Sequence, residues 1–340
     1  MMLSIIHRSG ILKILINIVI IVALMFSIGM SVALGAVDIQ LSTVWEALFD
    51  FDKDVTAHQV IQELRLPRVL AAAMVGAFLS VSGAMMQGMT RNPLASPSVM
   101  GVTHGASFVL VLMLAFFPAV SNLGLTLGSF IGAGLAVTLI FMAGSLSAGG
   151  LTPVKLALAG VAIGTMLSSL SSVIALHFQL EKQLGFWLAG GLADANWTSV
   201  KVLVLTGLIG MLIALSISKS ITVLNLGEDI ATGLGQNHFI IKVFGIITVL
   251  LLTGAAVSVA GVVGFVGLIV PHITRFIIGT DYGWIVPTSA LSGALLLVLA
   301  DIGARLINAP FETPVGALTS LIGVPFFLYL ARGSSGEGKS

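Results

Sequence analysis

Ten long apolar runs limit what this chain can fold into more than any other feature of its sequence. Each run is about 20 residues long, which is the length an α-helix needs to cross a bilayer. The apolar residues are continuous rather than alternating, which excludes the strand pattern of a membrane β-barrel. Only 9% of the 340 residues are charged, against about 25% in a soluble domain. The sequence therefore predicts an all-α membrane protein, one transmembrane domain over residues 1–340, with spans near 12–35, 66–89, 96–117, 122–144, 154–178, 198–218, 240–260, 262–279, 284–301 and 314–331.

The positive charges predict the orientation of these spans. Arg8 and Lys13 precede an apolar run from Ile14 to Leu34, which is longer than the 7–15 residues of a signal-peptide core, so we interpret it as a retained first span. An even number of spans places both chain ends on the same side. With both ends in the cytoplasm, nine lysines and arginines fall inside and six outside, as the positive-inside rule favours.

An internal repeat joins the two halves of the chain. VGAFLSVSG (Val75–Gly83) resembles TGAAVSVAG (Thr253–Gly261), with five identical positions at a constant offset of 178 residues. Five spans separate the copies, so they run in opposite directions, as in the inverted-topology repeats of transporters. Chance similarity between two glycine-rich helices is the alternative. The sequence predicts two pseudo-repeats, near residues 65–180 and 240–332.

Several long motifs carry a family resemblance. They are LRLPRVLAAAMVGAFLSVSGAMMQGMTRNPLASPSVMGVTHGA (64–106), LAGVAIG (158–164), FWLAGGL (186–192), LGEDIATGLG (226–235), GFVGLIVPHITR (264–275), ADIGAR (300–305) and PVGALTSLIGVPFFLYL (314–330). In this order they resemble the FecCD family, the permease subunits of bacterial type II ABC importers for ferric siderophores, haem and cobalamin. The resemblance implies a cytoplasmic (plasma) membrane location, a second identical or homologous permease subunit, two ATP-binding subunits and an extracytoplasmic substrate-binding lipoprotein. It also implies alternating access between the two permeases.

Three arginines mark the outer ends of two spans. Arg65 and Arg68 flank Pro67, a residue that suits a first helical turn, and Arg305 follows the ninth span. Arginines at such positions commonly extend to the membrane interface, which is the simpler interpretation. The resemblance implies instead that all three receive carboxylates of the binding protein.

The segment 220–239 between the sixth and seventh spans predicts a short cytoplasmic helix. Glu228 and Asp229 suit a helix N-terminus, and glycines at 233 and 235 suit its end. Ile230 and Leu234, four residues apart, give it an apolar face. A plain surface loop is the alternative. The resemblance implies a coupling helix that docks in a groove of the ATPase subunit, with the candidate residues Leu226, Gly227, Glu228, Asp229, Ile230, Ala231, Gly233, Leu234 and Gly235.

Polar residues near the helix breaks are candidates for the translocation pathway. Irregular backbone at membrane depth must be covered by protein or line a water-filled cavity, although packed kinks satisfy the same rule. Serines in membrane helices often bond their own backbone instead. The candidates are Gln87 and Asn92 near the second and third spans, and Thr165, Ser168, Ser169 and Ser172 on the fifth.

Other features argue against an enzyme or a metal protein. The tail GSSGEGKS (333–340) matches the P-loop pattern but lacks the strand–loop–helix context that binds phosphate, so we expect no ATP hydrolysis by this chain alone. Its six histidines show no i, i+4 pair and it has no cysteine. We therefore expect no metal and no cofactor on the chain. There is also no basic patch for nucleic acid.

The main rival is an ion-coupled secondary transporter. Such carriers usually hold an acidic residue inside the membrane, whereas the acidic residues here, including Asp301 and Glu312, fall in loops or at span ends. We therefore expect an importer permease in contact with membrane lipid. A ferric siderophore is the expected substrate, and cobalamin and haem remain open.

Overall fold

The computed structural model is all-helical over the residues it describes, which are 10–35, 39–97, 101–145, 153–309 and 311–334. Residues 335–340, most of the predicted tail, lie outside this range. Every predicted span corresponds to a helix, and seven helices are long and apolar enough to cross a membrane while three more are shorter. The helices that form the spans are α2 (Gly10–Ala33), α5 (Leu66–Thr90), α6 (Val102–Phe116), α7 (Asn122–Ser145), α8 (Pro153–His177), α10 (Trp197–Asn225), α12 (His238–Ala260), α13 (Val266–Ile278), α14 (Tyr282–Ile307) and α15 (Val315–Ser334).

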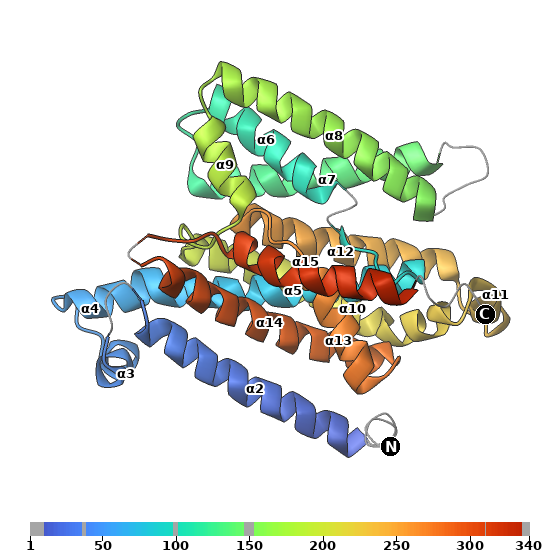
Figure 1. The fold of residues 1–340 in the computed structure, drawn as a ribbon, viewed down its shortest axis with the longest axis horizontal. Coiled ribbons are helices and arrows are strands. Elements are labelled where there is room, and N and C mark those ends of the chain that lie inside the picture. The colour runs from blue at the N-terminus through green and yellow to red at the C-terminus, as the bar shows by residue number, and fades with distance from the viewer. Residues whose placement is uncertain (1–9, 36–38, 98–100, 146–152, 310, 335–340) are drawn as a thin grey trace.

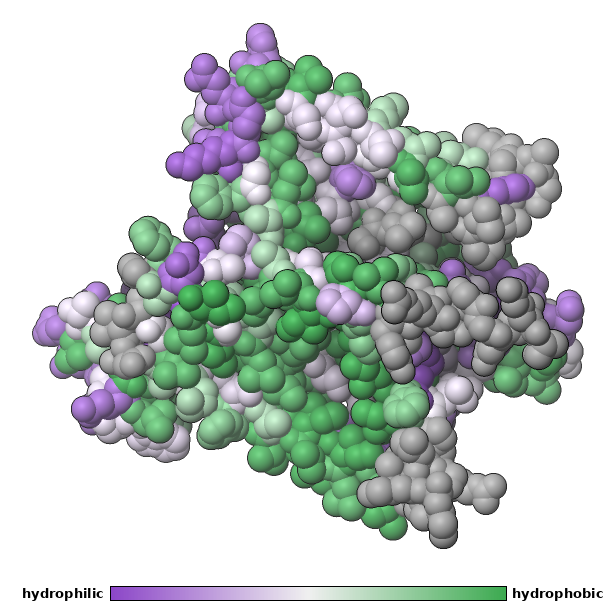
Figure 2. All heavy atoms as spheres, in the orientation of Figure 1, coloured by the Kyte–Doolittle hydropathy of each residue, from purple (hydrophilic) through white to green (hydrophobic). Residues whose placement is uncertain are grey.

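Helix α5 lies at the centre of the bundle, packed against α10, α12, α13 and α14. Helices α6, α7 and α8 form a second group, which joins the first through α12 (Figure 1). Helix α2 is peripheral and packs mainly on α14. Hydrophobic side chains cover the middle of the bundle, and hydrophilic ones gather toward its two ends (Figure 2). This distribution is the one that a bilayer requires.

The two ends of the bundle carry different small helices. One end carries α3 (Leu41–Phe49) and α4 (Thr56–Gln59), and the opposite end carries α11 (Glu228–Gly233). We call them the α3 end and the α11 end. Helix α2 begins and α15 ends at the α11 end (Figure 1), so both ends of the described chain lie on one side, as an even number of spans requires.

The two copies of the predicted repeat lie in α5 and α12. These helices pack against each other and run in opposite directions (Figure 1). Each is followed by a break and a shorter helix, α6 after α5 and α13 after α12. The residues that directly precede α6 and α13, Gly101 and Phe265, both have left-handed backbone conformations. This arrangement is that of an inverted repeat, while the boundaries proposed for the repeats stay a prediction.

Pro67 does not begin its helix, contrary to the sequence interpretation. Helices α4 and α5 are continuous through a π-helical turn at Val60–Arg65, so the segment 56–90 forms one 35-residue helix. The N–H of Leu66 donates to the carbonyl of Ile61, five residues earlier. Proline removes one N–H from a helix, and a π-turn is a common way to accommodate such a local mismatch.

Glycines let the central helices approach closely. A methyl group at Gly83 of α5 would overlap the carbonyl of Gly267 in α13, and one at Gly76 would overlap the carbonyl of Gly293 in α14. Close backbone approach of this kind is what holds membrane helices together, because lipid supplies no hydrophobic drive between them. The position of α5 therefore depends on residues without side chains.

We predict that Gly83→Ala destabilises the protein by about 1–3 kcal/mol, the usual cost of overpacking, because the new methyl group meets backbone that cannot rotate away. Thermal unfolding of the purified protein in detergent measures this. The control is Gly29→Ala on α2, where the methyl group would meet nothing within 4 Å. Equal melting temperatures for the two variants would contradict the assignment.

Candidate functional site

At the α3 end, Arg68 holds two carboxylates at once. Its Nε and Nη2 donate to Oδ1 of Asp301 at 3.0 and 2.9 Å, and its Nη1 donates to Oε1 of Glu312 at 2.5 Å. Arg305 pairs with the other oxygen of Asp301 at 3.2 Å. Two helices far apart in sequence, α5 and α14, are thereby joined by one buried carboxylate.

Asp301 is more buried than its sequence position predicted. We expected it at the outer end of the ninth span, but α14 continues to Ile307, and only 1% of the Asp301 side chain is exposed. The statement that every acidic residue lies in a loop or at a span end is therefore wrong for Asp301. Its sequence signal was the i, i+4 spacing to Arg305, which places both side chains on one helix face. Asp301 pairs with two arginines, as ionisable residues inside a membrane usually do with a partner of opposite charge.

The other two arginines close the C-terminal end of α2. Arg65 Nη1 donates to the carbonyls of Val32 and Ala33, at 2.6 and 2.7 Å. Arg305 donates to the carbonyls of Ser31 and Leu34, each at 3.0 Å. The last carbonyls of a helix lack internal partners, and cations there also complement the helix dipole. Sequence reasoning missed this use of Arg65 and Arg305, because nothing in the sequence tells which helix end will lie beside them. Their predicted docking role is not tested by this geometry and stays a prediction.

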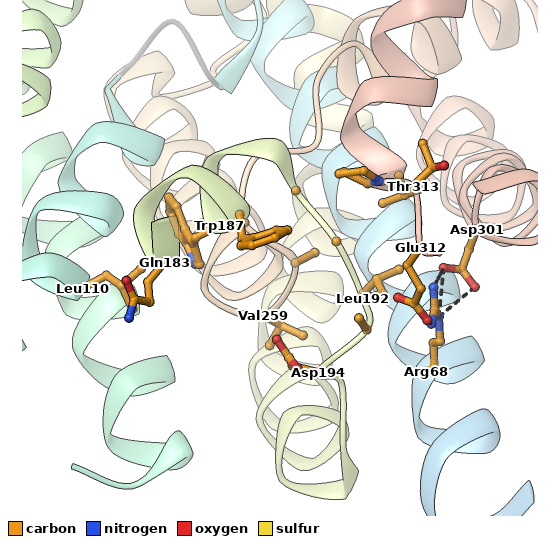
Figure 3. Close-up of a pocket in the computed structure, with 18 of the residues that line it drawn as sticks. Arg68, Leu110, Gln183, Trp187, Leu192, Asp194, Val259, Asp301, Glu312 and Thr313 are labelled. Carbon is orange, nitrogen blue, oxygen red and sulfur yellow. Dashed lines mark hydrogen bonds and ion pairs between the residues drawn. The ribbon is translucent and has the colours of Figure 1, made fainter. Parts of the chain in front are cut away.

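Beside the arginines lies a cavity of about 480 Å³ (Figure 3). Arg68, Asp301 and Glu312 form one side, and Leu110, Gln183 and Trp187 lie on the other. Gln183 and Trp187 belong to α9 (Glu181–Ala189), a short helix in the segment between the fifth and sixth predicted spans. The cavity therefore opens between the central group of helices and the group of α6 to α9.

Beside this cavity the ends of α9 and α12 meet the start of α15. The N–H of Gly191 donates to the carbonyl of Ala260 at 2.9 Å, the N–H of Val262 to that of Trp187 at 3.4 Å, and the N–H of Gly316 to that of Gly190 at 3.2 Å. Methyl groups at Gly190, Gly261 and Gly316 would each overlap a carbonyl of a neighbouring segment. We call these three residues the glycine junction. Gly190 and Gly316 belong to motifs that carry the family resemblance, and Gly261 ends the second copy of the repeat.

A second cavity, of about 670 Å³, also borders the glycine junction. Its lining includes Ala189, Val262 and Gly316 from the junction segments. It also includes Leu94 and Ser96, from the segment that follows α5. Residues at the junction therefore line both cavities.

The predicted pathway residues lie apart from one another. Gln87 is buried and its Nε2 lies 3.4 Å from the carbonyl of Gly267 in α13. Asn92 is exposed, and its side chain accepts from the N–H of Leu94 at 3.0 Å. On α8, the hydroxyls of Thr165, Ser169 and Ser172 donate to carbonyls of the preceding turn of their own helix. Their pathway role, and that of the half-buried Ser168, stays a prediction.

At the α11 end, α11 forms the short helix that the sequence predicts. Leu226, Ile230 and Leu234 are 63%, 50% and 66% exposed, so the predicted apolar face is open to a partner. Ala231, which we grouped with them as a coupling residue, is fully buried against the bundle. A helix this short can show only one face outward, and Ala231 lies on the opposite one.

An ion pair fixes α11 to the first turns of α12. Lys242 Nζ donates to Oε1 of Glu228 at 2.9 Å. This hydrogen bond from Lys242 lowers the pKa of the Glu228 carboxyl below its usual value. The pair therefore supports the fold at neutral pH and is lost in acid, as the pH falls through the lowered pKa.

No three histidine, aspartate or glutamate side chains of the described residues lie close enough together to hold a metal ion. The absence of a metal or cofactor on the whole chain stays a prediction.

We predict that Asp301→Asn destabilises the protein by about 3 kcal/mol or more, because removing one partner leaves buried charges uncompensated. Arg68 and Arg305 are only 12% and 10% exposed, and in this variant both would lose the carboxylate that they share. Unfolding of the purified protein in detergent checks this, with Asp54→Asn in an exposed loop as the control. If both variants unfold alike, the buried network does not support the fold.

Comparisons with known proteins place this geometry in a family. The iron(3+)-hydroxamate import system permease protein FhuB of Bacillus subtilis is 57% identical over 89% of this chain and 79% of its own length. The iron-uptake system permease protein FeuB of the same organism is 43% identical over 93% of this chain and 94% of its own. A solved metal-chelate type ABC transporter, in an inward-facing conformation, superposes with a TM-score of 0.81 at 29% identity, over 94% of this chain and 99% of that one. The model of the FecCD transport family matches residues 21–333, and the chain belongs to that family.

Proposed function

We propose that this chain is the membrane-spanning permease subunit of an ATP-driven importer for a ferric siderophore. The proposed substrate class is based on the similarity to the iron(3+)-hydroxamate permease over most of both chains. A ferric hydroxamate is accordingly the first substrate to test. Cobalamin and haem are the alternatives within the family.

The two cavities support an alternating-access mechanism. A second permease subunit, identical or homologous, faces the surface on which both cavities open and completes the pathway between the two copies. The glycine junction then separates an outer space from an inner one. The outer cavity walls are mostly apolar apart from the Arg68 cluster and a few polar side chains, so a large chelate passes without binding tightly.

The α3 end faces the outside in this proposal, and both chain ends lie in the cytoplasm of a bacterial cell. A substrate-binding lipoprotein docks at the α3 end, where Arg65, Arg68 and Arg305 supply positive charge. Two ATP-binding subunits dock at the α11 end. ATP hydrolysis belongs to them, and this chain carries no cofactor.

The exposed apolar face of α11 is the proposed contact with an ATP-binding subunit. Ile230 and Leu234 project from a helix that is anchored on one side by buried Ala231 and on the other by the Glu228–Lys242 pair. A rigidly held apolar anchor is typical of the centre of an interface. Movement of the ATP-binding subunits would therefore pass directly into α12.

We predict that the complete complex, reconstituted in vesicles with its binding protein, takes up radiolabelled iron as a ferric hydroxamate in an ATP-dependent manner. Haem and cobalamin, tested side by side, should give much less uptake. If haem or cobalamin were taken up in preference to the ferric hydroxamate, that compound would be the substrate and the siderophore proposal would be wrong. Uptake that follows an ion gradient without ATP would support a secondary transporter instead.

We predict that Ile230→Glu or Leu234→Glu abolishes transport and the stimulation of ATP turnover by loaded binding protein, because each places a charge in an apolar contact. Subunit co-purification and a vesicle ATPase assay measure the two effects. Ile230→Leu keeps the apolar area and should remain active. The buried position of Ala231 makes Ala231→Arg a poorer test, since it disrupts the chain itself. Normal coupling in both glutamate variants would refute the α11 assignment.

A further inference from the structure

Arg68 holds its two carboxylates in very different surroundings. Asp301, 1% exposed, takes Nε and Nη2, while Glu312, 48% exposed, takes Nη1 alone. Asp301 is also held by Arg305, whereas Arg68 is the ion-pair partner found for Glu312 among the described residues. Both carboxylates lie beside Arg68 (Figure 3), but Asp301 is buried in the core and Glu312 is exposed at the surface.

Glu312 belongs to the short connection between α14 and α15. Within it, the N–H of Thr313 donates to the carbonyl of Ala304 at 3.3 Å, which ties the connection to α14. Four residues after Glu312, Gly316 joins the glycine junction through its hydrogen bond to Gly190. A displacement of Glu312 thus acts on the backbone that leads into the junction.

We propose that Glu312 is an internal substitute for a carboxylate of the binding protein. This inference rests on the docking role proposed above for the arginines. In the undocked permease Glu312 occupies the outward N–H of Arg68. On docking, a carboxylate of the binding protein takes that N–H and Glu312 is released into solvent.

The exchange explains how Arg68, which is only 12% exposed, can be stable before docking and still bind a carboxylate of the binding protein. A buried donor without a partner is costly, while an ion pair at the surface is weak and is easily replaced by another of the same geometry. The exchange also gives docking a mechanical consequence. Releasing Glu312 removes one of the contacts that hold the connection to α15, which leads to the hydrogen bond between Gly316 and Gly190 beside the outer cavity.

The test is the binding of loaded binding protein to the whole complex in lipid nanodiscs, with rates measured by biolayer interferometry. Glu312→Gln should tighten binding by about two- to fivefold, the range of an exposed ion pair, because Arg68 no longer has to give up a partner. In an Arg68→Gln background the same change should have no effect. Arg305 still pairs with Asp301 there, so this variant keeps part of the network.

The matched control is Glu181→Gln, which removes the same charge at the start of α9, where no contact with Arg68 is found among the described residues. It should leave binding nearly unchanged. An equal gain for Glu181→Gln would reduce the effect to net charge. Weaker or unchanged binding of Glu312→Gln would overturn the proposal, because Glu312 would then contribute to docking itself or play no part in it.

The experiment also separates this inference from the proposed function. If the unmodified complex fails to bind any binding protein, or binds it independently of salt, the docking role of the arginines fails. If it binds with the expected loss of rate at high salt and Glu312→Gln changes nothing, only the exchange of Glu312 fails.

Discussion

A backbone carbonyl within a membrane needs a donor, and this requirement fixes the centre of the bundle. Pro271 lies inside α13 and has no N–H, so the carbonyl of Gly267, four residues earlier, loses its usual partner. Gln87 of α5 supplies a donor at 3.4 Å, and Gly83, one turn away, leaves room for the same carbonyl. The helix that carries both residues is the one that four others surround. The hydrogen bond to the Gly267 carbonyl and the close packing against it therefore occur at the same contact between α5 and α13.

The same rule applies at the glycine junction, which borders both cavities. The ends of α9 and α12 and the start of α15 meet there, and their backbone groups satisfy one another through hydrogen bonds. Irregular backbone is tolerated at membrane depth only under such cover, and the absence of side chains at Gly190, Gly261 and Gly316 lets the segments come close enough. The junction lies where α9 and α12 end and where α15 begins. Such a place can rearrange at lower cost than a helix, because few hydrogen bonds must break.

Features that depend on local sequence patterns could be predicted from the sequence. Features that depend on contacts between distant segments could not. The ten spans and the apolar face of α11 follow from run length and spacing, and the structure contains them. The burial of Asp301 and Ala231 depends on where α14 ends and on which side of α11 meets the bundle. The contacts of Arg65 and Arg305 with the end of α2 join residues more than 30 and 270 positions apart. The periodicity of a sequence gives no information about contacts between residues so far apart.

The two ends of the bundle are built for different kinds of association. At the α3 end Arg65, Arg68 and Arg305 already have partners within the chain, so the docking proposed above would exchange one contact for another. Such contacts govern the association rate and its dependence on salt more than the final affinity. At the α11 end Ile230 and Leu234 expose apolar surface on an anchored helix, and burial of apolar surface gives lasting affinity. A binding protein that must arrive and leave in every cycle suits the first surface. An ATPase that must remain attached while it transmits force suits the second.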